Sequence, residues 1–427
     1  ALQTVRWLTR PIAFMEDCRA RYGDAFTINL VGFRTPLVMI SDPAAVRALY
    51  SSRENGLPPG RTFALRRLVG PRSVLLLEGP EHLRRRQIML PPLHGQRMRA
   101  YETTVREIVD REVDSWPVGE PFPIAPRMRA ITLEVILRAV FGVTDPARLT
   151  HLRRLLPDLL ARSSGPGLQF AALFSRRLGR PDPLEAIRAL AAPVDRLLAA
   201  EIVQRRADPG VAEREDILSL LICARLDDGE AIDDAELRDQ LITLVVAGHE
   251  TTATGLAWAF DLLLHNPVAL DRLTAEARSP APATAYARAV VAEALRLRPV
   301  IPLAGRRLHD ALRTDELDLP SGTDVTPSIW LAHTRPESYA EPYAFRPERF
   351  VDRPPDTYAW IPFGGGVRRC LGAAFAEFEM RTVLRAVVSR AHLRSAGSLP
   401  ERVARRNVTL APRHGTPVIL TERRAAP

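Results

Sequence analysis

The sequence predicts a mainly α fold, one large helical domain with a small β-rich region, and three observations support this prediction. Alanine, leucine and arginine are abundant, and all three tolerate or favour helices. The stretch from Asp233 to His265 reads as one uninterrupted helix, which would span roughly 50 Å. Short strand-like segments occur over about residues 24–50, 300–325 and 395–422. We therefore expect residues 1–427 to form a single domain with strands drawn from both ends of the chain.

The N-terminal part of the sequence is predicted to form short helices and a β-hairpin. A helical pattern covers residues 12–22 and ends at the turn that Gly23 begins. The segment FTINLVGFRTPLVMIS then alternates and turns at Gly32, which predicts a β-hairpin. Asp42 and the proline after it open another helix. Residues 57–77 contain several prolines and glycines, and we expect them to be irregular.

The middle of the chain is predicted to be helical. Residues 81–245 are mostly helical in pattern, with breaks at prolines and glycines. Asp233 and Glu236 form a capping box at the start of the long helix, and Asn266 with the proline after it ends that helix.

The C-terminal part mixes helices and strands. A helix is expected over residues 284–297, and another is expected after Cys370, running to about residue 390. Thr409 and residues 418–420 are expected in a closing hairpin.

Composition excludes several classes of protein. The chain contains no lysine, which excludes a P-loop and a pyridoxal phosphate enzyme. His249 and Glu250 begin an HExxH-like motif, but alanine stands where the second histidine is needed. All 59 basic residues are arginine and are interspersed among 50 acidic residues, so the net charge of +9 does not predict nucleic-acid binding.

The same composition predicts the environment of the protein. Three cysteines are too few for a disulfide framework, and the first residues lack the apolar region of a signal peptide. No apolar run is long enough for a membrane span. We expect a cytoplasmic monomer that does not associate with membranes.

Cys370 is the residue with the most distinctive surroundings, because it lies in PFGGGVRRCLG at residues 362–372. A buried structural cysteine is the simplest interpretation. Glycines nearby would let a bulky partner approach the backbone, and a helix beginning at Gly372 would place the sulfur at a positive helix end. Arg368 and Arg369 add positive charge, so the pattern favours an anionic sulfur that acts as a ligand or a nucleophile.

The pattern Phe-x-x-Gly-x-Arg-x-Cys-x-Gly resembles the haem-binding loop of the cytochrome P-450 family. The resemblance implies haem b as cofactor and Cys370 as the thiolate ligand of its iron. It also implies that Phe363 packs beside the sulfur and that Arg368 pairs with a haem propionate. The glycines that this resemblance assigns to the cofactor loop are Gly364, Gly366 and Gly372.

A second motif of the family is ExxR, here Glu293 and Arg296 in VVAEALRLRP. Taken alone, this spacing is an ordinary ion pair on one helix face. The family joins it to an arginine in a later segment, which matches Arg349 in FRPERF. The resemblance implies a buried Glu–Arg–Arg network that supports the haem loop without taking part in the chemistry.

The long helix carries a third motif, VVAGHETTATG. It resembles the oxygen-binding groove of the family, in which Ala247 and Gly248 would open space above the iron. Thr251 would hydrogen-bond to dioxygen, and Glu250 would relay protons. Without the resemblance, Gly248 and the two threonines would be a helix defect.

Cationic partners for the haem propionates follow from the same resemblance. His82 and Arg86 match an H-x-x-x-R pair of the family, and Arg306 matches a further propionate arginine. Arg84 and Arg85 are expected to face outward.

The resemblance implies a monooxygenase that uses O2, a separate ferredoxin and a ferredoxin reductase to insert oxygen into a C–H bond. A peroxide-driven peroxygenase on the same fold is the alternative, although the intact Glu250–Thr251 pair favours the monooxygenase. A non-catalytic haem protein is a third possibility, and it would be signalled by loss of Cys370 or Thr251.

By analogy with the family, segments that vary would line the substrate pocket, and their side chains here are nearly all apolar. A hydrophobic small molecule, such as a terpenoid, steroid or fatty acid, is therefore expected, and a polar macrolide stays open. The pocket residues expected are Leu65, Leu68, Phe170, Thr243, Ile301, Leu303 and Val408.

Overall fold

The computed structural model describes residues 2–31, 35–52, 56–58, 63–95, 97–143, 145–163, 185–226, 229–279, 284–406 and 408–425. These residues fall into two compact units. Unit 1 comprises residues 1–59, 102–131 and 251–427, and unit 2 comprises residues 60–101 and 132–250. Helices predominate in both units, which confirms the predicted mainly α fold.

Unit 1 begins with helices α1 (Leu2–Thr9) and α2 (Pro11–Tyr22), followed by strands β1 (Ala25–Ile28) and β2 (Leu37–Ile40). The two strands pair antiparallel, as the alternating sequence predicts, although the predicted turn at Gly32 lies outside the described residues.

Helix α3 (Pro43–Ser51) follows, and its start is determined by a local cap. The Asp42 carboxylate accepts hydrogen bonds from the backbone N–H groups of Ala44 and Ala45 at 2.9 and 3.0 Å. Pro43 fits the first turn because it has no N–H to satisfy.

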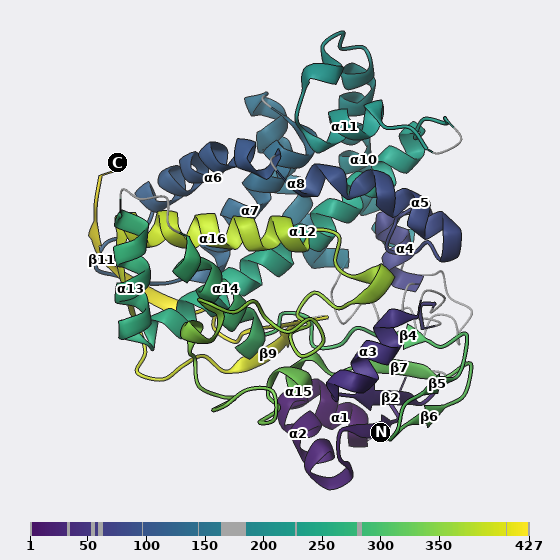
Figure 1. Cartoon of the computed structure of the whole chain (residues 1–427). Coiled ribbons are helices and arrows are strands. Elements are labelled where there is room, and N and C mark those ends of the chain that lie inside the picture. Colours follow the sequence, from purple (N-terminus) through teal and green to yellow (C-terminus); the bar gives the residue numbers. More distant parts are fainter. Residues whose placement is uncertain are drawn as a thin grey trace. The chain divides into compact units, whose positions relative to one another are not determined.

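The main sheet of unit 1 joins the two ends of the chain. Its strand order is β1-β2-β7-β4, where β4 is Arg306–Arg307 and β7 is Asp324–Pro327. Strand β2 pairs in parallel with β7, so the purple N-terminal strands and the green strands lie side by side in Figure 1. Apolar side chains of β1 and β2 pack on α2 and on α15 (Ile329–His333), with Phe14, Met15 and Trp330 in one buried cluster. The strands β5 (Leu312–Arg313) and β6 (Asp318–Leu319) form a separate small ribbon.

The C-terminal strands differ from the predicted closing hairpin. Strand β10 (Thr409–Pro412) pairs with β9 (Val403–Arg406), whereas β11 (Pro417–Arg423) pairs with β8 (Ala391–Ser395). Strand β11 also pairs with β3 (Pro121–Pro123), which the sequence analysis did not predict. Gly415 and Thr416 between them have positive φ angles of 77° and 55°, and β10 and β11 each pair with an earlier strand instead of with each other.

Three helices of unit 1 pack together next to the cysteine loop. Helices α13 (Pro267–Arg278) and α14 (Ala285–Leu297) both pack against α16 (Ala373–Arg390), and all three are visible together in Figure 1. The helices predicted over residues 284–297 and after Cys370 to about residue 390 are thereby confirmed within one or two residues. Among the described residues, unit 1 also has the short 3-10 turns η3 (Pro347–Phe350) and η4 (Gly366–Arg368), and unit 2 has η1 (Pro91–Leu93) and η2 (Val211–Glu213).

The long helix is α12 (Asp234–Leu264), which agrees with the predicted bounds within one residue at each end. Glu236 N–H donates to the Asp233 carboxylate at 2.9 Å, as expected at a capping box. The chain passes from unit 2 to unit 1 within this helix, between Glu250 and Thr251.

Unit 2 is almost entirely helical. Its elements, or the parts of them that fall in unit 2, are α4 (Phe63–Val69), α5 (Gly79–Met89), η1 (Pro91–Leu93), α6 (Arg97–Asp114), α7 (Ile124–Phe141), α8 (Pro146–Ser163), α10 (Glu185–Arg206), α11 (Ile217–Cys223) and α12. Helix α4 corrects the prediction that residues 57–77 are irregular, because the prolines and glycines of this stretch flank the helix instead of interrupting it.

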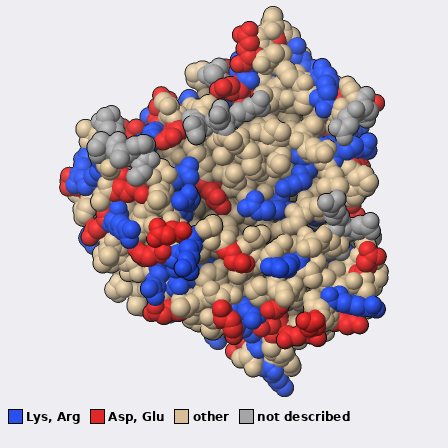
Figure 2. Space-filling view, in the orientation of Figure 1, with Lys and Arg blue, Asp and Glu red and all other residues tan. Residues whose placement is uncertain are grey.

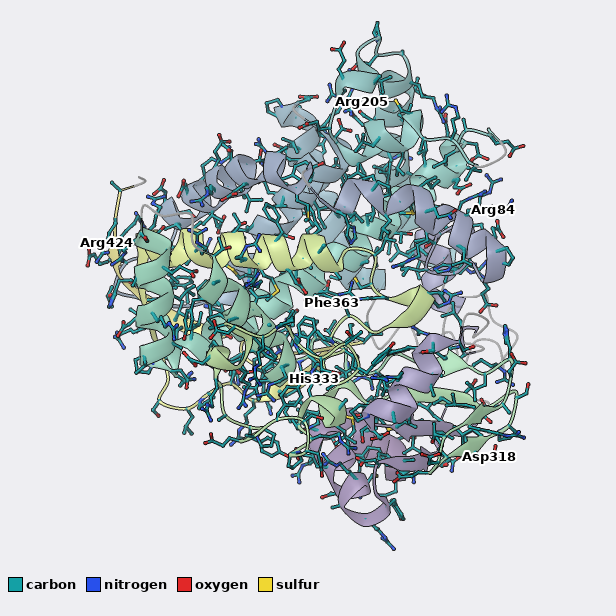
Figure 3. The ribbon with its side chains drawn as sticks, viewed as in Figure 1. Arg84, Arg205, Asp318, His333, Phe363 and Arg424 are labelled. Carbon is teal, nitrogen blue, oxygen red and sulfur yellow. The ribbon has the colours of Figure 1, made fainter. Side chains whose placement is uncertain are left out.

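A buried ionic network ties the helices of unit 2 together. The Arg205 guanidinium donates to the Glu201 carboxylate at 2.8 Å and to the Phe141 carbonyl at 3.0 Å, and it also bonds Asp216 and Ser219 (Figure 3). Arg205 is only 4% exposed, so its hydrogen bonds offset the cost of removing the charge from water.

Arginine and acidic side chains are intermixed on the face of the molecule seen in Figure 2, in agreement with their interspersion along the sequence. Among the described helices, none combines the length and the apolar character that a membrane crossing requires.

Candidate active site

Cys370 lies in unit 1 between a 3-10 turn and the first residue of α16. Its backbone N–H donates to the Phe363 carbonyl at 2.9 Å, which closes the loop. Gly364 and Gly366 have φ angles of 65° and 64°, a conformation that glycine adopts without strain. Gly372 caps α16, so the exposed thiol stands at the N-terminus of an 18-residue helix, as the sequence predicts.

The glycines of this loop are required by the residue packed behind it, Tyr50 at the end of α3. A Cβ atom on Gly365 would stand 2.2 Å from the Tyr50 ring, and one on Gly366 would stand 2.5 Å from the Tyr50 carbonyl oxygen. The loop backbone therefore lies directly on α3, because Cβ atoms at residues 364, 365 and 366 would all point toward Tyr50 or Ala304. Phe363 packs edge-to-face on Trp360, with 5.9 Å between the ring centroids, and is labelled in Figure 3.

Glu293, Arg296 and Arg349 meet as one cluster. The Glu293 carboxylate accepts from Arg296 at 2.7 and 2.9 Å and from Arg349 at 3.1 Å. Glu293 and Arg296 are completely buried, and Arg296 also donates to three backbone carbonyls of residues 333–344. The structure thus brings together the three residues that the ExxR motif and FRPERF predicted to form a network.

His333, which the sequence analysis did not single out, links this cluster to the cysteine loop. Its Nε2 accepts from the Ile361 backbone N–H at 2.8 Å, so its Nδ1 carries the proton and donates to the Arg296 carbonyl at 3.0 Å. The residue is fully buried at the end of α15 and is labelled in Figure 3. Burial lowers the pKa of His333 to about 3, so the ring is neutral at physiological pH. No sequence signal distinguishes it, because its partners are backbone groups.

Arg306 lies at the edge of the loop on strand β4. It is 7% exposed, and its guanidinium donates to the Gly305 carbonyl at 2.9 Å and to the Gly365 carbonyl at 3.2 Å. No carboxylate among the described residues forms an ion pair with it. Burial lowers the pKa of Arg306, although an arginine keeps its charge at any physiological pH. Arg368, by contrast, is half-buried within the 3-10 turn of the loop.

The predicted residues of unit 2 lie on α5 and α12. His82 is buried and Arg86 half-buried, and their i, i+4 spacing puts them on one face of α5. Arg84 is exposed as expected, but Arg85 does not face outward. Its guanidinium bonds the buried Glu236 carboxylate at 2.6 Å, because a nearby buried acid needs a cation.

The predicted oxygen-binding segment is less buried than most of helix α12. Ala247 is exposed and Glu250 and Thr251 are half-buried, although this helix is buried over most of its length. These positions share one face of the helix at i, i+3 and i+4. Gly248 has a packing role as well, since a Cβ atom there would stand 2.7 Å from the Ile136 side chain.

The predicted substrate-pocket residues have varied surroundings. The side chains of Leu65 and Phe170 lie outside the described residues. Leu68 is buried, whereas Val408 is 69% exposed. The Thr243 hydroxyl bonds Ser73 and the Asp239 carbonyl, both at 2.6 Å.

Two further predicted pocket residues lie a few positions after the end of α14. Ile301 and Leu303 are half-buried, and Leu303 packs on the cluster that contains Trp7.

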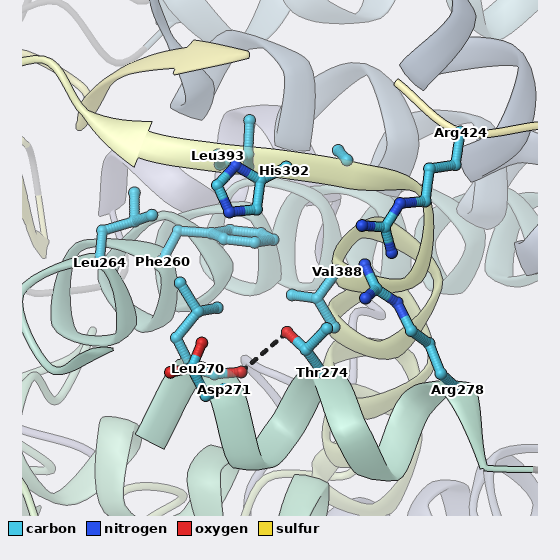
Figure 4. Close-up of a pocket in the computed structure, with 11 residues that line it drawn as sticks. Phe260, Leu264, Leu270, Asp271, Thr274, Arg278, Val388, His392, Leu393 and Arg424 are labelled. Atoms are coloured by element: carbon cyan, nitrogen blue, oxygen red, sulfur yellow. Dashed lines mark hydrogen bonds between the residues drawn. The ribbon is translucent and has the colours of Figure 1, made fainter. Parts of the chain in front are cut away.

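A separate cavity of about 240 Å³ occurs at the other end of α16 (Figure 4). Phe260 and Val388 line its apolar part, and Arg278 and Arg424 extend toward each other at one side. No predicted site residue lines it, so this cavity is distinct from the candidate site.

Comparison with known proteins identifies the family. The family model described as Cytochrome P450 matches residues 2–415. Cytochrome P450 135B1 of Mycobacterium tuberculosis is 40% identical over 424 residues, covering 97% of this chain and 88% of that protein. Cytochrome P450 137 of the same species is 40% identical over 400 residues, covering 93% of this chain and 83% of that protein.

Solved structures agree in fold. The chain resembles the retinoic acid-bound cyanobacterial CYP120A1, with a TM-score of 0.82, 24% identity and coverage of 98% of this chain and 96% of that chain. It also resembles the cytochrome P450DA haem domain, with a TM-score of 0.80, 23% identity and coverage of 97% and 93%.

The chain therefore belongs to the cytochrome P450 family. Membership confirms the family resemblance seen in the sequence, and it implies a haem cofactor, O2, a substrate and a redox partner. The protein is an enzyme of the monooxygenase class.

Stability should depend on pH through His333. Its pKa is about 3 in the folded chain against an ordinary value of 6.5, so the unfolded chain binds more protons between these values. The free energy of unfolding should therefore fall as the pH drops below about 6.5, by up to roughly 1.4 kcal/mol per pH unit from this group.

Urea unfolding of the wild type and His333→Gln from pH 7 to 4.5 would measure this contribution. The variant should be less stable at pH 7 and show a shallower pH slope. His309→Gln, which removes an exposed histidine, should keep the wild-type slope. Equal slopes for wild type and His333→Gln would contradict the assignment.

Proposed function

We propose that this enzyme is a haem-thiolate monooxygenase in which Cys370 ligates the iron, a hydrophobic small molecule is the substrate, and a separate ferredoxin and its reductase supply electrons. The observation that carries the proposal is the exposed thiol of Cys370 at the start of α16, in a loop whose backbone is held by buried groups. A sulfur at a helix N-terminus is stabilised as the thiolate, which is the form that binds iron.

The residues of unit 1 fit a haem in three respects. The loop offers an anionic ligand at Cys370, and its glycines at residues 364 to 366 let the backbone lie directly on Tyr50. Arg306 is a buried cation without a carboxylate partner among the described residues, which suits a propionate. Glu293 and Arg296 stabilise the segment that precedes the loop, because Arg296 hydrogen-bonds its backbone directly and through His333. We assign His82, Arg86 and Arg368 to the propionates as well, on the family motif.

When bound, the haem supplies the activation of dioxygen, and the chain supplies its placement and its protons. Thr251 has a hydroxyl that can donate and accept a hydrogen bond on the open face of α12. Glu250, one residue before it, is half-buried and can exchange protons with solvent. A carboxyl and a hydroxyl at adjacent positions would relay protons from solvent to the hydroxyl oxygen of Thr251.

An apolar substrate is favoured by the residues assigned to its pocket. Leu68 is buried, Ile301 and Leu303 are half-buried, and Thr243 has its hydroxyl satisfied internally. Within each unit these side chains offer few polar partners to a ligand, which favours a terpenoid, steroid or fatty acid. Retinoic acid, named for one structure of the same fold, belongs to this class of apolar ligands.

The ferredoxin would dock near the cysteine. Arg369 is exposed and directly precedes Cys370, and ferredoxins are generally acidic. A cation at this position would favour encounter by electrostatic attraction.

Replacing Cys370 should change the spectrum of the haem. The reduced wild-type protein with carbon monoxide should absorb at the wavelength that gives the family its name. Cys370→Ala should lose this band, because no thiolate then donates electron density to the iron. Cys223→Ala, which removes another exposed cysteine, should keep it. A band that survives Cys370→Ala would refute the assignment.

Thr251→Ala should separate oxygen consumption from product formation. Loss of the hydroxyl should lower product per NAD(P)H oxidised by about tenfold or more and raise hydrogen peroxide release, because proton delivery contributes factors of about 10²–10⁴. The same variant driven by added peroxide should keep most of its turnover. A wild type that is faster with peroxide than with ferredoxin, reductase and NAD(P)H would favour the peroxygenase alternative.

Arg369→Glu should raise the apparent KM for ferredoxin several-fold at low ionic strength, with kcat at saturating ferredoxin little changed. Arg313→Glu provides a control, since Arg313 is 76% exposed on β5 away from the cysteine in sequence. Steady-state reduction assays at two salt concentrations would test this, and an unchanged KM for Arg369→Glu would argue against docking here.

A further inference from the structure

Tyr50 occupies an unusual position at the end of α3. It is 6% exposed, and its ring covers the backbone of the cysteine loop at Gly365. Its hydroxyl projects past the ring to the neighbouring glycine, since a Cβ atom built on Gly364 would stand 3.8 Å from Tyr50 Oη. The same imagined Cβ atom would stand 3.7 Å from Ala304. The hydroxyl therefore lies beside the first glycine of the loop.

The Tyr50 hydroxyl is buried and has no hydrogen-bond partner among the described residues. Buried O–H groups nearly always have a partner, because leaving one unsatisfied is costly. Burial raises the pKa of Tyr50 to about 12, so the group is a protonated donor at physiological pH. The hydrogen-bond acceptor for the Tyr50 hydroxyl must therefore come from outside the described residues.

The character of that acceptor follows from Arg306. Its guanidinium carbon lies 5.6 Å from the centre of the Tyr50 ring, and it too is buried without a carboxylate among the described residues. Its hydrogen bonds go to the carbonyls of residues 304, 305 and 365, which leaves N–H donors over from the five of a guanidinium. A single anion would balance the buried charge of Arg306 and accept the hydrogen bond of the neighbouring Tyr50 hydroxyl.

We propose that Tyr50 Oη donates a hydrogen bond to the haem propionate that Arg306 binds, so that Tyr50 is a haem-binding residue as well as a support of the loop. This inference rests on the proposed function, because it requires a haem on the Cys370 loop. A single carboxylate has enough lone pairs to accept from the phenol and the guanidinium together. The bond would connect α3 to the cofactor, while the ring connects α3 to the loop.

The rate of haem loss from the holoenzyme tests the proposal independently of activity. Haem transfer to excess apomyoglobin would be followed for the wild type, Tyr50→Phe and Tyr50→Leu. The Phe variant keeps the ring on Gly365 and removes only the hydroxyl, and it should release haem about tenfold faster or more, as expected for loss of a hydrogen bond to a charged group.

Tyr339→Phe is the matched control. Tyr339 is also buried, has a hydroxyl without a partner among the described residues, and lies against an arginine, Arg296. Because it packs on α14 residues and not on the cysteine loop, its Phe variant should release haem at the wild-type rate.

The outcomes separate the two roles of Tyr50. Fast release from Tyr50→Phe with an intact thiolate–carbon monoxide band supports the proposal. Wild-type release from Tyr50→Phe and fast release from Tyr50→Leu alone would mean that only the ring matters, which overturns it. A wild-type protein without that band would instead refute the haem-thiolate assignment, so the two failures are distinguishable.

Discussion

The buried ion pair between Glu293 and Arg296 is the interaction on which the rest of the site depends. Both side chains are removed from water, so each would be severely destabilising without the other. The pair also satisfies backbone groups of the segment before the cysteine loop, directly through Arg296 and indirectly through His333. One charged contact on α14 therefore determines where a long irregular stretch of chain lies, and Arg349 completes the charge balance.

The loop that this segment leads into is shaped by the absence of side chains. Gly365 and Gly366 allow the backbone to lie on Tyr50, and the left-handed conformations at Gly364 and Gly366 turn the chain toward Cys370. The result is an exposed cysteine at a helix N-terminus, in a loop whose backbone is supported by Tyr50.

Electrostatics of the site separate into a neutral part and a charged part. His333 stays neutral because burial lowers its pKa, and so it adds no charge to the cluster of two arginines and one glutamate. Arg306 keeps its charge but has no acid partner among the described residues. Arg306 is thus a buried positive charge at the edge of the loop, and the neutral side chain of Tyr50 lies beside it.

The sequence alone predicted the mainly helical fold and the bounds of α12 and α14, and it singled out Cys370, Glu293, Arg296 and Arg349 as site residues, because these predictions depend on local periodicity or on short motifs. Tertiary structure decided the rest. The pairing of β10 and β11 with other strands depends on long-range partners, and Arg85 turns inward because an acid distant in sequence is buried beside it. His333 and Tyr50 were invisible in the sequence because their roles come from backbone groups and glycines that only folding brings to them.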